Sequence, residues 1–394
     1  MTNAVYLNAL GLTNPLGWGK AAVADGLFAG RTSGMAAGSD WLPDRSVFVG
    51  AVMGALPDMA PEFTLYNSRN NRLLLSALLE IRGEIEQAIA TYGPDRVAVI
   101  LGTSTSGVGD NEAGIAYKMA EGAFPAGFDY DRQDNASAAL FVRQYFALTG
   151  PVMTVSTACT SSAKTLASAR RMMDAGFCDA AIVGGADSLC KLTINGFASL
   201  ELLSESLCNP FSRNRNGINI GEAAAVFLMT REEAPVRVAG IGETSDAYHM
   251  STPDPEGTGA FNAMRIALEK SELAASDLAY LNLHGTATVL NDSMEAKAVS
   301  GLLGGIPCSS TKPLTGHTLG AAGATELAFL WLALQPEYSG GKLPPHIWDG
   351  ETDEDMAPVQ LTAIGTTKDA ARPAMMTNSF AFGGNNISVI LAEG

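Results

Sequence analysis

Residues 152–173 read VMTVSTACTSSAKTLASARRMM and join two kinds of predicted secondary structure. The apolar run 152–157 predicts a strand, and residues 161–173, rich in Ala and small polar side chains, predict a helix. Cys159 stands where the strand would turn abruptly into the helix. Because such strand-to-helix units build layered folds, the stretch indicates an α/β protein.

The same alternation of short apolar runs and longer periodic stretches continues along the chain. Further strands are predicted at 96–101, 179–183, 223–229, 278–283 and 387–391. Further helices are predicted at 71–89, 261–273, 292–303 and 321–334. The strands are nearly continuous in apolar character, so we expect mostly parallel sheets that are covered on both faces.

A weak internal repeat accompanies this pattern. Three pairs of segments resemble each other: residues 102–105 and 285–288, the strands ending at Thr157 and Thr311, and residues 221–229 and 384–392. The spacing differs from pair to pair, so the two copies would differ in loop length. These short matches favour, without deciding, two halves at 1–233 and 234–394, with the seam in the polar stretch 232–235.

The composition bounds the size and class of the protein. Its 394 residues exceed the roughly 250–300 that one hydrophobic core serves, so two cores or a fused double domain are expected. Hydrophobic residues make up 47% and charged residues 17%, which excludes a disordered chain and a coiled coil. The formal net charge of −16 argues against binding to nucleic acid or to an anionic membrane surface.

The sequence also predicts a cytoplasmic location without a membrane span. The most apolar helical stretch, residues 320–334, carries Glu326 and falls short of the roughly 18–20 residues of a span. The first cation is Lys20, so the N-terminus lacks the basic segment of a secretory signal. Five scattered cysteines fit reduced thiols better than a disulfide framework.

Cys159 is the candidate nucleophile. Its predicted position at the first turn of a helix exposes the thiol to free backbone N–H groups and to the positive end of the helix dipole, which favour the thiolate. A free cysteine is also commonly a small buried apolar residue, and we assign that role to Cys178, Cys190 and Cys308. Cys208 is left undecided.

Two of the four histidines end predicted strands at glycine-bearing loops. His284 lies in Leu-Asn-Leu-His-Gly-Thr, and His317 lies five positions after Lys312. Ligands bind at the carboxyl ends of strands in open α/β sheets, so the two imidazoles and Cys159 could converge there. His249 and His346 are expected to be structural. No His-Glu-x-x-His pair occurs, so no metal site is predicted.

Six motifs together carry a family resemblance. They are Asn14-Pro-Leu-Gly17, Ser156-Thr-Ala-Cys159, Asn209-Pro-Phe-Ser-Arg213 with Gly221-Glu222, His284-Gly-Thr, Lys312 with His317, and Asn378-Ser-Phe-Ala-Phe-Gly-Gly384. In this order the chain resembles the β-ketoacyl-[acyl-carrier-protein] synthases, over nearly its whole length. The resemblance implies a thiolase-like duplicated fold, a five-layered αβαβα sandwich. It is closest to the elongating type, because residues 375–390 lack the second Cys of a thiolase and the site would be Cys, His, His rather than Cys, His, Asn.

The resemblance also implies a role for each site residue. Cys159 would carry the acyl group, while His284 and His317 would stabilise the enolate formed when a malonyl thioester loses carbon dioxide. Lys312 and Glu326 would form a charge pair that orients the histidines. The backbone N–H groups of Cys159 and Phe382 would hold the oxyanion. Phe382 would also act as a gate, with Gly383 and Gly384 providing backbone freedom, and Thr286, Thr288 and Phe380 would contact the substrate.

The implied partners follow from the same resemblance. An acyl carrier protein would deliver substrate on its phosphopantetheine arm and dock at Arg69 and Arg72, with no tightly bound cofactor. The chain would form a homodimer or a heterodimer with a homologous synthase or chain-length factor. A non-catalytic chain-length-factor role is the alternative function.

Several positions depart from the family pattern. Ala381 and Ala287 stand where Gly, or Gly or Ser, is usual, and Asn385 stands where Thr or another small polar residue is usual. The polar run 109–112 falls where part of the acyl pocket or a dimer contact is expected. Fatty-acid elongation and a specialised polyene or polyketide pathway both stay open.

Overall fold

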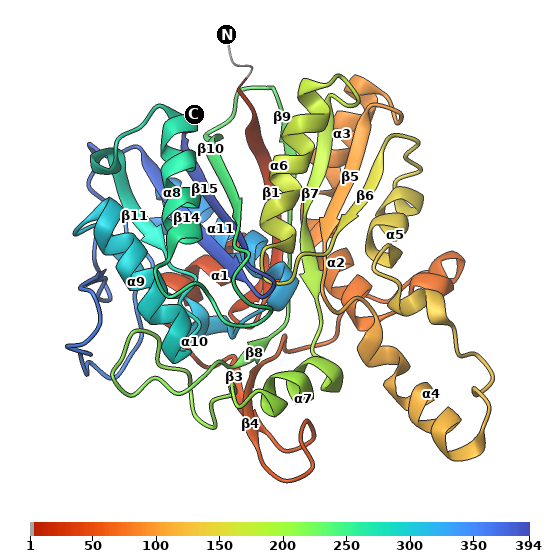
Figure 1. The fold of residues 1–394 in the computed structure, drawn as a ribbon. Coiled ribbons are helices and arrows are strands. Elements are labelled where there is room, and N and C mark those ends of the chain that lie inside the picture. Colours follow the sequence, from red (N-terminus) through yellow and green to blue (C-terminus); the bar gives the residue numbers. More distant parts are fainter. Residues whose placement is uncertain (1–3) are drawn as a thin grey trace.

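The computed structural model describes residues 4–394, and its strands form one large mixed sheet and one small sheet (Figure 1). The strands of the large sheet are β1 (Tyr6–Asn14), β2 (Gly17–Trp18), β5 (Val97–Gly102), β6 (Val152–Val155), β7 (Ala180–Asp187), β9 (Ala223–Thr230), β10 (Val236–Ser245), β11 (Leu278–Asn282), β12 (Pro307–Ser309), β13 (Gln360–Leu361), β14 (Ala374–Ala381) and β15 (Asn385–Glu393). The small sheet contains β3 (Met35–Gly38), β4 (Val47–Gly50) and β8 (Ile220–Gly221).

The large sheet contains the same five-strand arrangement twice. The first unit has the order β6-β5-β7-β9-β1 and the second has the order β12-β11-β14-β15-β10. In each unit the first three strands are parallel and the last two add antiparallel. The units meet where Tyr6 of β1 pairs with Arg237 of β10. The duplicated fold is therefore confirmed, and the three pairs of similar segments lie at corresponding places: after β5 and β11, at β6 and β12, and at β9 and β15.

Helices form three layers around these units. The α-helices are α1 (Gly19–Phe28), α2 (Arg69–Glu80), α3 (Arg82–Tyr92), α4 (Val108–Glu121), α5 (Ser137–Tyr145), α6 (Ser161–Asp174), α7 (Lys191–Ser199), α8 (Thr258–Ser271), α9 (Val289–Leu303), α10 (Lys312–Thr315), α11 (Ala322–Leu334) and α12 (Pro336–Ser339). Helices α1, α6 and α11 fill the core between the two units. Helices α2 and α5 cover the outer face of the first unit, and α8 and α9 cover that of the second. The result is the expected αβαβα sandwich.

Close packing explains two glycine-bearing strands that the sequence pattern missed. In β1, a Cβ at Gly11 would come within 2.0 Å of the Ala77 carbonyl oxygen on α2. In β10, a Cβ at Gly242 would come within 1.9 Å of the Ala263 carbonyl oxygen on α8. Glycine lets the covering helix approach each strand at the same place in the two units.

Three expectations need correction. The sheet is mixed rather than mostly parallel, because β15, β10, β1 and β9 pair antiparallel at its centre, and the sequence pattern did not predict β1 and β10. The predicted helix 71–89 is two helices, since Ile81 has non-helical dihedral angles (φ −119°, ψ 21°). Strand β6 is not buried on both faces: it ends the first unit at the edge of the sheet, and Met153 is exposed.

A cap covers one end of the sheet. It comprises the small sheet and α7, with α4 projecting to the side (Figure 1). Residue Ile220 of β8 forms a β-bridge with His317, so the cap contacts one of the candidate site residues directly. Within residues 4–394, no helix is both long and apolar enough to cross a bilayer.

Candidate active site

Cys159 lies on a tight turn between β6 and α6, as the sequence predicts. Ala158 has a left-handed backbone (φ 53°), which costs an L-residue about 1–2 kcal/mol. The Ser161 hydroxyl donates to the Ala158 carbonyl oxygen at 2.6 Å and accepts from the Thr157 N–H at 2.9 Å. These bonds hold the turn so that the thiol sits just ahead of the first turn of α6.

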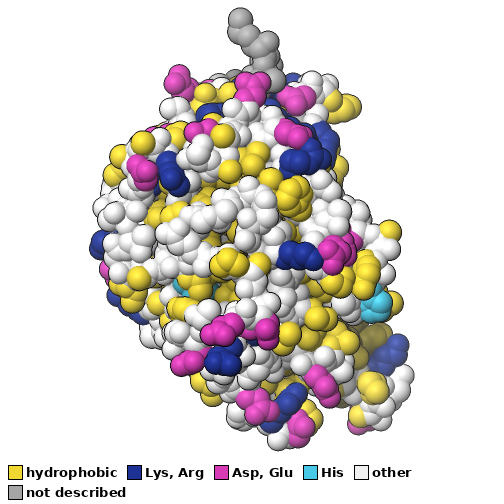
Figure 2. All heavy atoms as spheres, turned by 60° about the vertical axis from the view of Figure 1, so that its left-hand side comes forward, with side chains coloured by type: hydrophobic (Ala, Val, Ile, Leu, Met, Phe, Trp, Pro, Cys, Tyr) yellow, Lys and Arg dark blue, Asp and Glu magenta, His cyan; other side chains and the backbone are white. Residues whose placement is uncertain are grey.

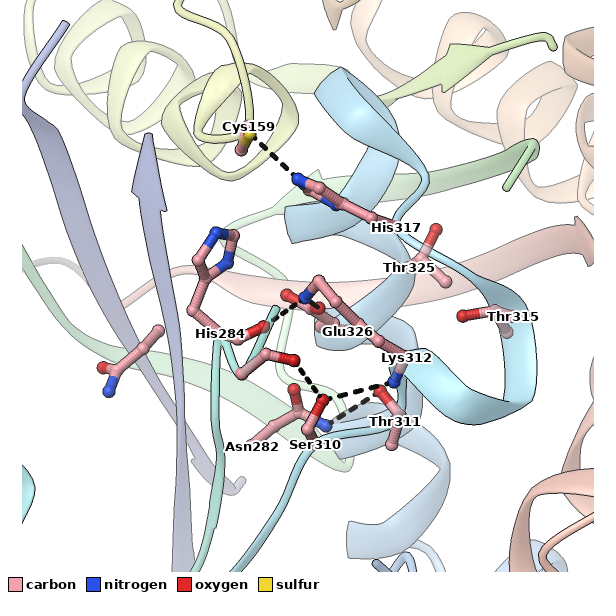
Figure 3. A network of polar contacts seen from close by, with 12 residues as sticks. Cys159, Asn282, His284, Ser310, Thr311, Lys312, Thr315, His317, Thr325 and Glu326 are labelled. Atoms are coloured by element: carbon pink, nitrogen blue, oxygen red, sulfur yellow. Dashed lines mark hydrogen bonds and ion pairs between the residues drawn. The ribbon is translucent and has the colours of Figure 1, made fainter. Parts of the chain in front are cut away.

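The two predicted histidines meet this thiol. His317 Nε2 lies 2.9 Å from Cys159 Sγ, and the two imidazole rings pack edge to face with centroids 5.3 Å apart (Figure 3). One ligand atom from each of Cys159, His284 and His317 lies within 4.8 Å of the others. The predicted convergence is therefore present and draws on both halves of the fold, but His317 follows the short helix α10 rather than a strand end.

Burial sets the protonation of all three groups. It raises the pKa of the Cys159 thiol to about 12, with Lys312 opposing the rise. This is opposite to the thiolate predicted from the helix terminus, because removal from water outweighs the helix end. Burial and the Lys312 charge hold the pKa of both imidazoles well below its ordinary value, so the resting site is a neutral thiol between neutral imidazoles. Both Nδ1 atoms are buried without a hydrogen-bond partner in the described part of the chain.

The predicted charge pair lies directly behind the histidines. The Lys312 ammonium donates to Glu326 Oε1 at 2.6 Å and also to the carbonyl oxygen of His284 (Figure 3). Both side chains are almost fully buried. Removing one partner of a buried ion pair strongly destabilises a protein, because the other charge is left uncompensated. Since Lys312 also binds the His284 carbonyl oxygen, the pair fixes the backbone that carries His284.

The same three atoms could in principle ligate a metal ion. A thiolate and two imidazoles form a common zinc ligand set. Here the nearby Lys312 ammonium opposes a further cation, and the thiol is held in its neutral form. The set therefore fits nucleophilic chemistry better than metal binding.

A cavity of about 330 Å³ opens onto Cys159 and both histidines. Its wall includes every other residue predicted to bind substrate or to gate the site: Thr286, Thr288, Phe380, Phe382, Gly383 and Gly384. The Thr286 and Thr288 hydroxyls are 3.0 Å apart, and the Phe380 ring packs edge-on against His284. Polar and apolar side chains thus share the approach to the thiol, as a substrate with a polar arm and an apolar chain requires.

Three buried carboxylates that sequence reasoning missed hold the loops of the site. Glu295 accepts from the N–H groups of His284 and Gly285, both at 2.8 Å. Asp292 accepts from the Ala287 N–H at 3.2 Å. Asp187 binds residues 103–105 and the N–H of Gly320. The sequence did contain a signal for these carboxylates. Asp187 is a lone acidic residue at the end of an apolar strand, and Asp292 and Glu295 lie on the helix directly after a glycine-bearing loop.

The departures from the family pattern have structural consequences. Ala287 has a left-handed backbone (φ 64°), which explains why Gly is usual there. Asn385 accepts a hydrogen bond from the Lys164 ammonium at 2.8 Å. Ala381 ends β14 opposite Asn385. The polar run 109–112 does not line the described cavity: Asp110 instead binds the Arg69 N–H, and Glu112 binds the Leu192 N–H.

The predicted docking arginines are tied to partners within the chain. Arg69 forms a two-pronged ion pair with the fully buried Glu222, and Arg72 donates to the carbonyl oxygens of Leu56 and Pro57. Elsewhere, on the face shown in Figure 2, basic and acidic side chains are interspersed among apolar ones. Carrier docking at Arg69 and Arg72 stays a prediction, with less free charge than the sequence suggested.

Of the two histidines expected to be structural, His346 is buried as predicted, whereas His249 is exposed and lines the cavity. His346 accepts from the Ser310 N–H and contacts the Pro210 carbonyl oxygen, so both ring nitrogens have partners. His249 accepts from two backbone N–H groups at the edge of the cavity. All five cysteines are free and buried.

Comparison with known proteins identifies two adjoining family segments. Residues 68–234 match the model described as "Beta-ketoacyl synthase, N-terminal domain", and residues 236–347 match "Beta-ketoacyl synthase, C-terminal domain". Among curated relatives, 3-oxoacyl-[acyl-carrier-protein] synthase 2 of Rhizobium meliloti is 34% identical over 264 residues, which is 62% of this chain. The Staphylococcus aureus protein of the same name is 32% identical over 262 residues, also 62% of this chain. The matches cover 61% and 62% of these relatives, so the chain spans about three fifths of their length.

Solved structures agree over the full chain. A ketosynthase (ApeO) in complex with its chain length factor (ApeC), from Xenorhabdus doucetiae, contains a chain with a TM-score of 0.94 and 43% identity, covering 99% of this chain and 98% of that one. A beta-ketoacyl synthase from Burkholderia phymatum has a TM-score of 0.88 and 25% identity, with 99% coverage of both chains.

Proposed function

Because the chain belongs to the β-ketoacyl synthase family, we propose that it condenses an acyl group held on Cys159 with a malonyl unit delivered by an acyl carrier protein. The observation that carries this proposal is the 2.9 Å contact between Cys159 Sγ and His317 Nε2 at the cavity wall, backed by the buried Lys312–Glu326 pair. The carrier's phosphopantetheine arm supplies the thioester, and no resident cofactor is required.

The first half-reaction is acyl transfer. The Cys159 sulfur attacks the thioester carbonyl carbon, and the carrier thiolate leaves and takes up the proton given up by Cys159. His317 Nε2 lies 2.9 Å from the sulfur and is placed to take the thiol proton as the new C–S bond forms. The backbone N–H groups of Cys159 and Phe382 hold the oxyanion in this proposal.

The second half-reaction is decarboxylative condensation. The malonyl thioester loses carbon dioxide, and its electron pair forms an enolate that His284 stabilises by a hydrogen bond from its neutral ring, and His317 adds a second one in the tautomer that has its proton on Nε2. The enolate carbon attacks the acyl carbon on Cys159, the C–S bond breaks, and the ketoacyl chain leaves on the carrier. Thr286, Thr288 and Phe380 line the path of the arm.

A homologous partner chain is part of this proposal. Strand β6 ends the large sheet with an unpaired edge in the described chain, and α4 carries the exposed side chains of Ile115, Tyr117 and Met119. A similar chain lies in a complex of a ketosynthase with its chain length factor. We also propose that the boundary between the two halves lies at residues 233/234, between β9 and β10. The five free thiols support a cytoplasmic location.

The test is intact-mass spectrometry after incubation with a panel of acyl carrier proteins bearing different acyl groups. The expected result is one added acyl group that is lost in Cys159→Ala, and its mass distinguishes fatty-acid from polyene or polyketide substrates. No acylation in a folded, partner-bound chain would favour the alternative, a non-catalytic chain-length factor.

A further inference from the structure

The gate predicted at Phe382 is the tip of a β-hairpin. Residues 382–384 connect β14 to β15, and Gly383 and Gly384 both have left-handed backbones (φ 80° and 74°). The Phe382 ring packs against Phe197 with centroids 5.6 Å apart, across the cavity that leads to Cys159. A swing of Phe382 that includes its backbone must therefore move this hairpin tip.

One side of the tip is tied to a neighbouring loop. The Gly383 N–H donates to the Met250 carbonyl oxygen at 2.8 Å, and the Asp246 N–H donates to the Gly384 carbonyl oxygen at 2.7 Å. Both partners belong to the segment after β10, where Met250 is exposed. This side of the tip is thus anchored to an exposed loop rather than to the core.

The other side is tied to the helix that follows the nucleophile. Lys164 lies on α6, five positions after Cys159, and its ammonium donates to Asn385 Oδ1 at 2.8 Å. Asn385 is the first residue of β15, directly after the two glycines. The bond therefore joins the rigid central helix to the base of the gate, across the two halves of the fold.

The environment of Lys164 is unusual for a merely structural lysine. The side chain is half-buried, and within residues 4–394 no carboxylate forms an ion pair with it. The nearby carboxylate of Glu243 is instead bound by Arg171, two turns further along α6. Burial lowers the pKa of Lys164, and the nearby Glu243 opposes this only in part, so the one group that accepts a hydrogen bond from the ammonium is the neutral amide of Asn385. A Leu or Met would pack there without that cost, whereas only a donor can hold Asn385.

We propose that Lys164 is a positioning residue that holds the Phe382 gate in its closed position through Asn385. This inference rests on the proposed function, in which Phe382 moves to admit the malonyl group. Opening the gate then requires the Lys164–Asn385 hydrogen bond to break. The bond starts on α6, the helix that directly follows Cys159, so it fixes the resting position of the gate relative to the nucleophile.

Two variants should shift the gate in opposite directions. Lys164→Met removes the donor and keeps the length of the side chain, whereas Asn385→Asp converts the hydrogen bond into an ion pair. The control is Arg171→Met, which breaks another polar contact of α6, the ion pair with Glu243 on β10, and leaves the Lys164–Asn385 pair in place. Each variant is made in the full chain, with its partner if it needs one.

The first readout is hydrogen exchange at the amides of Gly383 and Gly384, which requires no activity. Exchange should become roughly threefold to tenfold faster in Lys164→Met, the range for one charge-assisted hydrogen bond at a half-exposed site, and slower in Asn385→Asp. The second readout is malonyl thioester decarboxylation. Its KM should fall by a similar factor in Lys164→Met and rise in Asn385→Asp, while acylation of Cys159 stays within about twofold.

The outcomes separate this proposal from the function it rests on. Unchanged hydrogen exchange in Lys164→Met, or an equal change in Arg171→Met, would overturn the proposal that Lys164 holds the gate closed. Loss of acylation together with decarboxylation in Lys164→Met would also overturn it, since Lys164 would then act on the thiol itself. If the unsubstituted protein shows no decarboxylation, the proposed function fails, and exchange alone still decides whether Lys164 restrains the hairpin.

Discussion

The loops after β5 and β11 occupy corresponding places in the two halves and do different work. Each has the pattern Gly-Thr-x-Thr, and buried carboxylates hold each one: Asp187 in the first half, Glu295 and Asp292 in the second. The first loop forms hydrogen bonds with Asp187 and does not line the described cavity. The second loop follows His284 and lines the cavity. Duplication supplies two equivalent scaffolds, and the side chains at the strand ends decide which chemistry each half contributes.

The largest effect is expected when the nucleophile, the chemical contribution of the first half, is removed. Cys159→Ala should abolish acyl transfer and leave the fold intact, because one sulfur at a cavity wall contributes little packing. Intact-mass measurement of acylation, with circular dichroism as the folding check, tests this. In Cys159→Gln, malonyl decarboxylation should persist without condensation, since the residues of the second half are untouched. A Cys159→Ala protein that still makes ketoacyl product would refute the mechanism.

Substitutions of the two histidines of the second half should have different effects, because only His317 is in hydrogen-bond contact with the thiol. His284→Ala should leave acylation measurable and lower decarboxylation by a factor on the order of 10²–10³, as expected for the loss of one oxyanion donor. His317→Ala should lower both, because Nε2 lies 2.9 Å from a thiol whose pKa is raised by burial and is placed to take its proton. Acyl-enzyme yield and carbon dioxide release are measured on the same samples. Equal loss of acylation in the two variants would assign thiol activation to the pair instead.

The sequence could predict Cys159 and His284 because each combines a reactive side chain with the end of an apolar strand. His317 follows the short helix α10 instead, and the family motifs placed it, Lys312 and Glu326 in the site. Strands β1, β10 and β14 were missed because glycines or polar residues interrupt their apolar character, although they lie at the centre of the sheet. Their stability comes from neighbouring strands and close helices, which no local pattern contains.

The electrostatics of the site could not be predicted from local sequence either. A helix N-terminus favours a thiolate, but Cys159 is buried in a site that it shares with His284, His317 and Phe382, which are remote in the chain. The same applies to Asp187, whose partner Gly320 lies 133 positions away. Local motifs identify the reactive atoms, and the assembled fold sets their pKa values.

Glu295, which binds the loop after His284, should make the free energy of unfolding depend on pH. Burial raises the pKa of Glu295 from 4.5 to about 7, so the folded state binds more protons than the unfolded state between these values. The free energy of unfolding should therefore fall as pH rises through this window, by about 2–3 kcal/mol from this group. Urea unfolding between pH 5 and 8 should show a shallower slope in Glu295→Gln. Parallel slopes would contradict the assignment, and Asp187→Asn puts the first loop to the same test.

The smallest effect compares two strained alanines, one in each half. Ala158 precedes Cys159 and Ala287 lies in the loop after His284, both with left-handed backbones. Glycine would relieve about 1–2 kcal/mol of steric strain and add about 0.5–1 kcal/mol of unfolded-state entropy. Ala287 also loses a fully buried methyl group worth about 0.8 kcal/mol, whereas Ala158 is only partly buried. Ala158→Gly should thus stabilise the protein by about 0.5 kcal/mol and Ala287→Gly should be nearly neutral, a difference that denaturant midpoints can resolve. The reverse order would mean that the strain at Ala158 is already relieved by its Ser161 hydrogen bond, and that the loop of the second half, not the nucleophile turn, is the more strained element.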